Sequence, residues 1–311
     1  MTGYLIDVSG NEYILPPLLS WSVVHTLGLP CESFELCSIF SSDMARRLPT
    51  IAGFRGEYNN ETVFRGVVDE YEIDISESGS VLRVSGRGMA ALLLDNESAA
   101  IEYGACTLHD IIRNHVTPCE ITDISSQSMP AIWGYTVPSG ASHWKALYGF
   151  THFAGGIMPR FSRDGKLVIS SDTGPLKVIS SESAVFDIKL RERRYGVISE
   201  MLVKNAVLGT SDTVRNEEFI ARGGRCKRVI TVPRKTGYDA MRYTGAFQIE
   251  NSMKDSYVLC VTVEEVFAAF PNEIVELNFE HLGIQGRYKV SESESWQNED
   301  GAGTRIKLIK P

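Results

Sequence analysis

The sequence has 311 residues, of which 43% are hydrophobic and 23% are charged, and its formal net charge is −8. This composition is typical of a folded soluble protein and excludes an intrinsically disordered chain. The negative charge also argues against nonspecific affinity for DNA or anionic membranes, because such binding requires Lys and Arg to neutralise phosphates.

The length predicts about two domains. The N-terminus has no basic region followed by an apolar core, and the apolar runs are too short to span a membrane, so we expect folding in a cytoplasm and no stable membrane insertion. None of the six cysteines forms a Cys-x-x-Cys pair, which favours reduced thiols buried as small hydrophobic side chains. They are Cys31, Cys37, Cys106, Cys119, Cys226 and Cys260.

Residues 1–60 read as a succession of short strands. Strand patterns cover residues 4–8, 20–26, 33–40 and 51–58, with glycine and proline turns between them. Helical periodicity is absent here. The spacing is that of a small antiparallel barrel or sandwich.

Residues 64–96 predict a β-hairpin followed by a short helix. Tyr71, Ile73 and Ile75 alternate with acidic residues, the pattern of a strand with one face buried and one face in water. A glycine-containing turn at residues 76–80 leads into a second alternating strand at 82–87. The apolar run 89–94 is compatible with a short helix.

Residues 97–182 change to helical periodicity. Thr107 and Asp110 have the spacing of a capping box, and the helix that follows should end at Pro118. A second helix should begin after Ser142 and end at Gly155-Gly156. A strand is expected at residues 167–170, so this segment predicts an α/β unit.

Strand patterns return at residues 184–190, 197–208 and 228–232. Residues 251–270 fit both a helix and a buried strand, and Glu264, Glu265 and Pro271 favour a helix for the later part. Residues 284–288 and 303–308 match 64–68 and 79–84 in the order strand, turn, strand. A duplicated barrel explains this match, although two glycine-led hairpins can also arise by chance.

These patterns predict a mainly β protein of the α+β class with two similar small antiparallel barrels flanking an α/β insertion. We expect the first β-barrel domain at residues 1–96, the α/β insertion domain at 97–182 and the second β-barrel domain at 183–311.

Catalytic motifs are absent from the sequence. There is no Gly-x-Ser-x-Gly elbow and no phosphate-binding loop, and the Gly86-x-Gly88 pair lacks the third glycine of a dinucleotide site, so it should serve a strand-to-helix bend. His109 and His115 do not share a helix face, and neither do His143 and His152. We therefore expect no catalytic residues, no metal site and no cofactor.

Two basic clusters lie within the acidic chain. One comprises Arg191, Arg193 and Arg194, and the other comprises Arg222, Arg225, Lys227 and Arg228. Arginine is enriched at interfaces, so these clusters could contact a subunit or partner; the alternative is a solvated face.

Several segments resemble the tail baseplate hub proteins of bacteriophages, a family that includes the Mu-type hub, the late control protein D and the N-terminal part of the VgrG spike proteins of type VI secretion. The segments similar to the first half of the family's sequences are residues 32–36, 63–69, 84–88, 91–96 and 106–112. Those similar to its C-terminal end are residues 282–290 and 303–308. The family-motif residues are Phe34, Phe64, Gly66, Gly86, Arg87, Asp95, Asn96, Gly286, Gly303 and Thr304.

The resemblance implies a homotrimer in the virion tail baseplate, assembled in the bacterial host cytoplasm. Six barrels would then match a hexameric tail tube on one side, while the threefold axis matches a trimeric central spike on the other. The implied partners are the tail tube or distal tail protein, the spike and other baseplate proteins, with DNA and tape-measure protein only passing through the lumen. The chain lacks the family's repetitive β-helix and any lysozyme-like segment.

Two other functions remain open from the sequence. A tail-associated cell-wall hydrolase could use Cys31, Cys119 or Cys226 as nucleophile with a histidine as base. A β-rich carbohydrate-binding module is a third hypothesis, with little support in the residues.

Overall fold

The structure is a computed structural model that describes residues 1–310 apart from 29, 31, 78, 181–183, 233–237 and 254–255; the side chains of residues 232 and 238–244 are also outside the description. The chain divides into two compact units, residues 1–186 with 262–306, and residues 187–261 with 307–311. The division passes through three strands, β16 (Val185–Glu192), β20 (Tyr257–Val263) and β23 (Gly301–Ile309). The domain boundaries expected near residues 96 and 182 stay a prediction.

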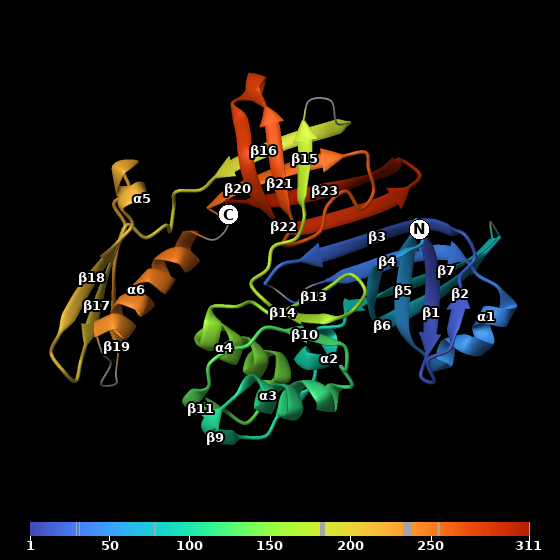
Figure 1. The fold of residues 1–311 in the computed structure, drawn as a ribbon. Helices are drawn as coiled ribbons and strands as arrows, with labels where there is room; N and C mark the ends of the chain where they lie inside the picture. The colour runs from blue at the N-terminus through green and yellow to red at the C-terminus, as the bar shows by residue number, and fades with distance from the viewer. Residues whose placement is uncertain are drawn as a thin grey trace. The chain divides into compact units, whose positions relative to one another are not determined.

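The first barrel is built from the strands β1 to β7, whose course Figure 1 shows. Its sheet order is β3-β4-β7-β6-β5-β1-β2, and every neighbouring pair is antiparallel. The strand patterns predicted for the first sixty residues are confirmed, but the sequence missed the short helix α1, which is capped by Ser41. The elements are β1 (Thr2–Asp7), β2 (Glu12–Ile14), β3 (Leu18–Thr26), β4 (Ser33–Ile39), α1 (Ser42–Arg47), η1 (Leu48–Thr50), β5 (Ile51–Tyr58), β6 (Glu61–Ser76) and β7 (Gly79–Gly88).

The predicted hairpin is also confirmed, but one of its faces is not buried. A bulge between Val68 and Glu70 shifts the register with β7, so Tyr71, Ile73 and Ile75 continue the core-facing side of β6. These three side chains are nevertheless 42%, 37% and 71% exposed, because this half of β6 extends beyond the packed core. The expectation of a buried apolar face was therefore wrong for the isolated chain.

The insertion packs the helices α2, α3 and α4 against several short strands around one main core. The capping box at Thr107 and the helix capped by Ser142 and Gly156 are both confirmed. The first helix is short and continues as a π turn and a 3-10 turn through Cys119. The elements are α2 (Ala91–Leu94), β8 (Glu97–Ser98), β9 (Ile101–Cys106), α3 (Leu108–Ile111), η2 (Ile112–Val116), η3 (Thr117–Cys119), β10 (Ile124–Ser126), β11 (Ile132–Val137), β12 (Ala141–Ser142), α4 (His143–Gly155), β13 (Arg160–Phe161) and β14 (Leu167–Ile169).

The second barrel continues the sheet of the first. β22 (Ile284–Asn298) pairs antiparallel with β3 from Glu292 to Gln297, so the two lie side by side in Figure 1. The strand order through this joint is β16-β20-β23-β22-β3-β4-β7-β6. The earlier part of β22, from Ile284 to Lys289, pairs with β21 (Ile274–Phe279), which also pairs in parallel with β15 (Leu176–Ser180).

The helix favoured for the later part of residues 251–270 is wrong. β20 occupies Tyr257–Val263, and the chain then crosses the barrels as an irregular segment up to Phe270. Phe267 has a positive φ of 56° and stacks on Trp21 with ring centroids 5.2 Å apart. Side chains satisfy the backbone here, since Ser295 accepts from Phe267 N and Thr304 accepts from Ala268 N. Tertiary packing thus overrides the local helix signals.

The second unit holds a separate three-stranded sheet in the order β18-β17-β19. The strands are β17 (Glu200–Asn205), β18 (Ser211–Arg215) and β19 (Lys227–Val232), with helices α5 (Glu217–Ala221) and α6 (Tyr238–Met253). The sequence analysis predicted no element at α5, and α6 reaches only the start of the stretch 251–270 that was left open between helix and strand. The last short element of the chain is η4 (Glu280–Leu282) in the first unit.

The fold class predicted from the sequence, mainly β with an α/β insertion between two barrels, is confirmed. Among the helices of the described residues, none combines the length and hydropathy that crossing a bilayer requires.

Candidate functional site

The first family-motif residues form the core of the first barrel. Phe34 stacks on Phe54 with ring centroids 4.2 Å apart and lies 5.4 Å from Phe64, and all three are at most 1% exposed. Aromatic contacts of this kind add to the stabilisation from area burial. Phe34 and Phe64 therefore contribute to the packing of the barrel core.

Gly66 and Gly86 allow the paired strands β6 and β7 to approach closely. A Cβ at Gly66 would lie 2.1 Å from the Arg87 carbonyl oxygen, and a Cβ at Gly86 would lie 1.9 Å from that of Val67. No side chain fits at such distances, so both positions require glycine. The expected strand-to-helix bend follows Gly88, the last residue of β7 before α2, whereas Gly86 lies inside β7 and serves the close approach to β6.

Arg87 clamps the β6 bulge to the end of α2. Its guanidinium donates to both carboxylate oxygens of Asp69, at 2.7 and 2.8 Å, and to both of Asp95, at 3.0 and 2.8 Å. The hydrogen bonds to the two carboxylates, with the opposite charges, raise the pKa of Arg87 and lower that of Asp95. Asn96 completes the helix end by donating from Nδ2 to Leu92 O.

Replacing Arg87 with lysine is expected to lower the free energy of unfolding by about 1 kcal/mol, because an ammonium group cannot bind two carboxylates bidentately and the clamp is partly exposed. Thermal unfolding of the purified chain measures this. Arg83→Lys is the matched control, since Arg83 is exposed on the same strand. An equal effect of the two changes would contradict the role of the clamp.

The family-motif residues of the second barrel are mostly buried. Thr304 is fully buried; its hydroxyl donates to Glu265 O, accepts from Ala268 N and lies 3.0 Å from Ser295 Oγ. A Cβ at Gly303 would lie 2.5 Å from Val263 O, whereas Gly286 has a φ of +113° and open space around it. Gly303 and Thr304 thus fix the crossing segment.

The two long hairpins correspond residue by residue. β7 begins at Gly79 with φ +139° and β23 begins at Gly301 with φ +142°, and in each hairpin two residues separate this glycine from the preceding strand. The offset between the hairpins is therefore 222, so Gly301 matches Gly79, two residues before the match at Gly303 that the sequence suggested. In β22 the buried positions change from even, at Tyr288 and Val290, to odd, at Ser293 and Ser295. β6 changes at the corresponding bulge.

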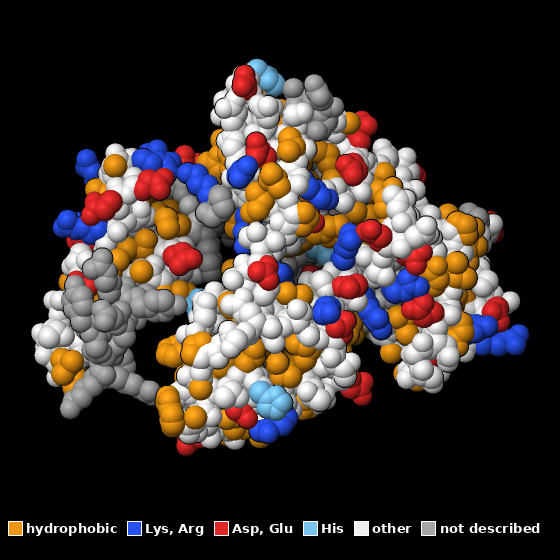
Figure 2. Space-filling model, viewed as in Figure 1, with side chains coloured by type: hydrophobic (Ala, Val, Ile, Leu, Met, Phe, Trp, Pro, Cys, Tyr) orange, Lys and Arg blue, Asp and Glu red, His pale blue; other side chains and the backbone are white. Residues whose placement is uncertain are grey.

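The face of the joined sheet opposite the two cores is charged. It holds a shallow groove of about 590 Å³. Both barrels contribute to its walls, because β22 and β3 form one continuous sheet there. The charged residues of the groove are Glu35, Glu70, Glu72, Glu294, Arg83 and Arg305. Figure 2 shows side chains of both signs interspersed over the face in view.

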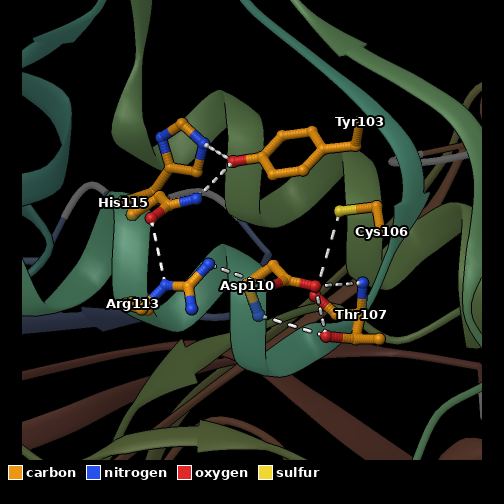
Figure 3. Close-up of polar contacts among 7 residues, drawn as sticks. Tyr103, Cys106, Thr107, Asp110, Arg113 and His115 are labelled. Atoms are coloured by element: carbon orange, nitrogen blue, oxygen red, sulfur yellow. Dashed lines mark hydrogen bonds and ion pairs between the residues drawn. The ribbon is translucent and has the colours of Figure 1, made fainter.

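A pair of histidines lies in the insertion, His115 fully buried and His143 half-buried. His115 Nδ1 is 3.0 Å from His143 Nδ1. On the other side of the ring, His115 Nε2 is 3.0 Å from the Tyr103 hydroxyl, a contact that Figure 3 shows. Burial lowers the pKa of His115 to about 4. Spacing along helices could not find this pair, because the two residues come from different elements 28 positions apart.

The hydrogen bonds of this cluster do not pair a cysteine thiol with a histidine ring, as a nucleophile and its base would require. Cys119 Sγ donates to the backbone oxygen of His115, not to the ring, and burial raises the pKa of the Cys119 thiol. Cys106 is buried beside the capping box of Thr107 and Asp110 (Figure 3), and burial raises the pKa of its thiol to about 11. Both shifts disfavour the reactive thiolate. Cys226 is half-buried, and Cys31 lies outside the described residues.

Metal-ligating side chains do not gather in the part of the chain that the structure describes: it holds no group of three or more His, Cys, Asp or Glu placed to bind an ion. The five described cysteines are free thiols, and Cys37, Cys106 and Cys119 are buried, as the sequence predicted for small hydrophobic side chains.

Comparison with solved structures places the fold among phage tail proteins. A tail protein from Neisseria meningitidis aligns with a TM-score of 0.79 and 17% identity over 99% of this chain and 96% of its own. The 43 kDa tail protein of prophage MuSo2 from Shewanella oneidensis gives 0.79 and 18% over 100% and 98%. No family model and no curated protein matches the sequence.

A component of the type VI secretion system of E. coli, itself described as similar to bacteriophage T4 tail proteins, aligns with a TM-score of 0.58 and 12% identity over 94% of this chain and 73% of its own. The resemblance to phage tail and VgrG-type proteins that the sequence predicted is thus confirmed at the level of the fold.

Proposed function

We propose that this chain is a structural baseplate hub of a phage tail or a related contractile injection machine. Three copies form a ring that adapts a hexameric tail tube to a trimeric central spike. The observation that carries this proposal is the correspondence of the β6–β7 and β22–β23 hairpins within one continuous sheet. Two equivalent barrels per chain give three chains six similar units around an axis, the symmetry such an adaptor needs.

The charged face of the joined sheet is the natural wall of the lumen. Four glutamates and two arginines line its groove, and the whole chain carries a net charge of −8. A wall of this sign repels the phosphate backbone, so DNA and tape-measure protein pass without binding tightly. The fold of phage tail proteins supports the same role.

The ring would contact the tube or a distal tail protein above, the spike below and other baseplate proteins around it. We place it in the virion, after assembly in the host cytoplasm. Light scattering and particle imaging of the purified chain, alone and with its spike partner, test this. A trimeric ring is expected; a chain that stays a 34.4 kDa monomer even beside the spike would overturn the proposal.

The hub has no catalytic step of its own under this proposal. The thiols of Cys106 and Cys119 are held neutral by burial, and both ring nitrogens of His115 are engaged. The purified chain is expected to release no fragments from peptidoglycan, as measured by chromatography of soluble muropeptides. Turnover that disappears in Cys31→Ala, Cys119→Ala or Cys226→Ala would restore the hydrolase hypothesis.

A further inference from the structure

The outer half of β6 lacks a strand partner on one edge. β7 pairs with β6 as far as Ser76, whereas β5 pairs with it only from Glu61 to Val67. Between residues 69 and 75, the edge of β6 away from β7 is therefore unpaired among the described strands. The same stretch leaves three apolar side chains in solvent, those of Tyr71, Ile73 and Ile75. Open edges with exposed apolar residues favour the addition of another strand.

The corresponding half of β22 is complete. With the offset of 222, residues 70–75 of β6 correspond to Glu292–Gln297 of β22. That stretch pairs antiparallel with Trp21–Thr26 of β3. Ser293 and Ser295, which correspond to Tyr71 and Ile73, are each 1% exposed. The second barrel thus shows what a covered β6 would look like.

The strand that corresponds to β3 is β16. In the order β16-β20-β23-β22-β3-β4-β7-β6, the first four strands repeat the last four. Within the described strands, β16 has β20 as its neighbour on one side and none on the other. β16 therefore offers the free edge that β3 uses in the joint with β22.

The side chains of β6 and β16, the two strands with an open edge, are complementary. β16 alternates the apolar residues Phe186, Ile188 and Leu190 with the charged residues Asp187, Lys189 and Arg191. Phe186 and Leu190 are 61% and 52% exposed. β6 alternates its apolar residues with Glu70, Glu72 and Asp74. Antiparallel pairing can therefore place apolar against apolar on one face and acidic against basic on the other.

We propose that residues 70–75 of β6 in one copy pair antiparallel with β16 of a second copy, and that this joint closes the ring. The inference rests on the proposed trimeric hub. The contact is head-to-tail, first barrel to second barrel, and repeats the β22–β3 joint that connects the barrels within a chain.

The pairing register follows from matching rows of residues across the two barrels. In the first barrel, Val23 of β3 lies opposite Phe34 of β4, which lies opposite Gly86 of β7. The offset of 222 matches Gly86 with Leu308.

In the second barrel, the row through Leu308 runs to Leu190. Gly86 pairs with Val68, and a Cβ at Gly86 would meet the oxygen of the residue before it, Val67. A Cβ at Gly303 would likewise meet Val263 O, so Gly303 lies opposite Glu264. Five residues further along the antiparallel pair, Leu308 then lies opposite Leu259. Arg193 N donates to Ser256 O, which places Leu190 beside Leu259. Leu190 therefore corresponds to Val23.

This correspondence fixes every pair of the joint. Since Ser295 lies opposite Val23 in β22–β3, Ile73 lies opposite Leu190 of the second copy. A slip of one residue would set acids against apolar side chains, so the alternation of the two strands disfavours it. The remaining pairs are Glu70 with Arg193, Tyr71 with Glu192, Glu72 with Arg191, Asp74 with Lys189 and Ile75 with Ile188.

Charge reversal tests the joint. Glu72→Arg and Arg191→Glu are each expected to shift the chain from trimer to monomer in light scattering at concentrations where the unaltered chain is trimeric. The double variant is expected to restore the trimer. Val8→Lys is the control, because Val8 is 76% exposed and lies outside both strands. Trimer formation by both single variants would overturn the proposed joint.

A disulfide crosslink identifies the partner strand. Ile73→Cys with Leu190→Cys is expected to give covalent dimers and trimers on oxidation, seen as a ladder in non-reducing electrophoresis, while each single-cysteine variant stays monomeric. A trimer that gives no ladder would refute the joint and leave the hub intact. An unaltered chain that never forms a trimer would instead refute the hub itself.

Discussion

Replacing Gly86 with alanine is expected to destabilise the first barrel by about 3 kcal/mol or more. The new Cβ would lie 1.9 Å from Val67 O and 2.7 Å from a ring carbon of Phe34. The carbonyl belongs to the paired strand β6 and the ring to the core stack, so neither can withdraw cheaply. Overpacking of a well-filled core typically costs 1–3 kcal/mol, and a backbone clash lies at the upper end. Urea unfolding followed by tryptophan fluorescence measures the loss.

Gly104→Ala is the matched control. Gly104 also lies in a strand, β9, but a Cβ there would meet no atom within 4 Å. Its replacement should change the free energy of unfolding by less than about 0.5 kcal/mol. If Gly86→Ala lowered the free energy of unfolding no more than Gly104→Ala, the fold would not require the close approach of the paired strands β6 and β7.

Local signals in the sequence were sufficient for elements that are stabilised locally. The capping box of Thr107 and Asp110 and the helix that begins after Ser142 and ends at Gly156 are fixed by hydrogen bonds within a few residues. The hairpin of β6 and β7 follows from its alternation and its glycine turn. Residues close in sequence decide such features, so one sequence predicts them.

Features held by distant residues escaped prediction. The segment after Val263 carries helix signals, yet Phe267 stacks on Trp21 and Ser295 binds its backbone, contacts that no local pattern contains. The His115–His143 pair was missed for the same reason. The glycine of β23 that matches Gly79 was placed at Gly303 instead of Gly301, because identities are sparse and only the backbone angles reveal the correspondence.

The exposed face of β6 was mispredicted in a way that carries functional information. Alternation of Tyr71, Ile73 and Ile75 with acids specifies a covered face, and the isolated chain leaves that face open. A sequence pattern that a monomer does not use is typical of a surface completed by another chain. The alternation in β6 thus marks a candidate assembly surface in the sequence. The choice of β16 as its proposed partner depends on the strand order of the sheet.

Replacing Glu32 with glutamine is expected to stabilise the protein above neutral pH. Glu32 is 9% exposed, and burial raises the pKa of its carboxyl group to about 8 from an ordinary 4.5. It borders a small pocket with Trp144 and Arg160, beside Gly88, where a Cβ would collide with the carboxyl group. The described residues provide no ion pair for it. The folded chain therefore favours the protonated acid.

The sign of the pH dependence follows from the raised pKa. Below about pH 4.5 the carboxyl is protonated in both states, and as the pH rises to 8 only the unfolded chain loses the proton, so stability falls. At about 1.4 kcal/mol per unit, the loss is of the order of 4 kcal/mol. Glu32→Gln should remove this slope between pH 5 and 8, as measured by urea unfolding at each pH. Glu35→Gln, an exposed position on β4, should leave the slope unchanged, and equal slopes in all three proteins would show that Glu32 is ionised in the folded state.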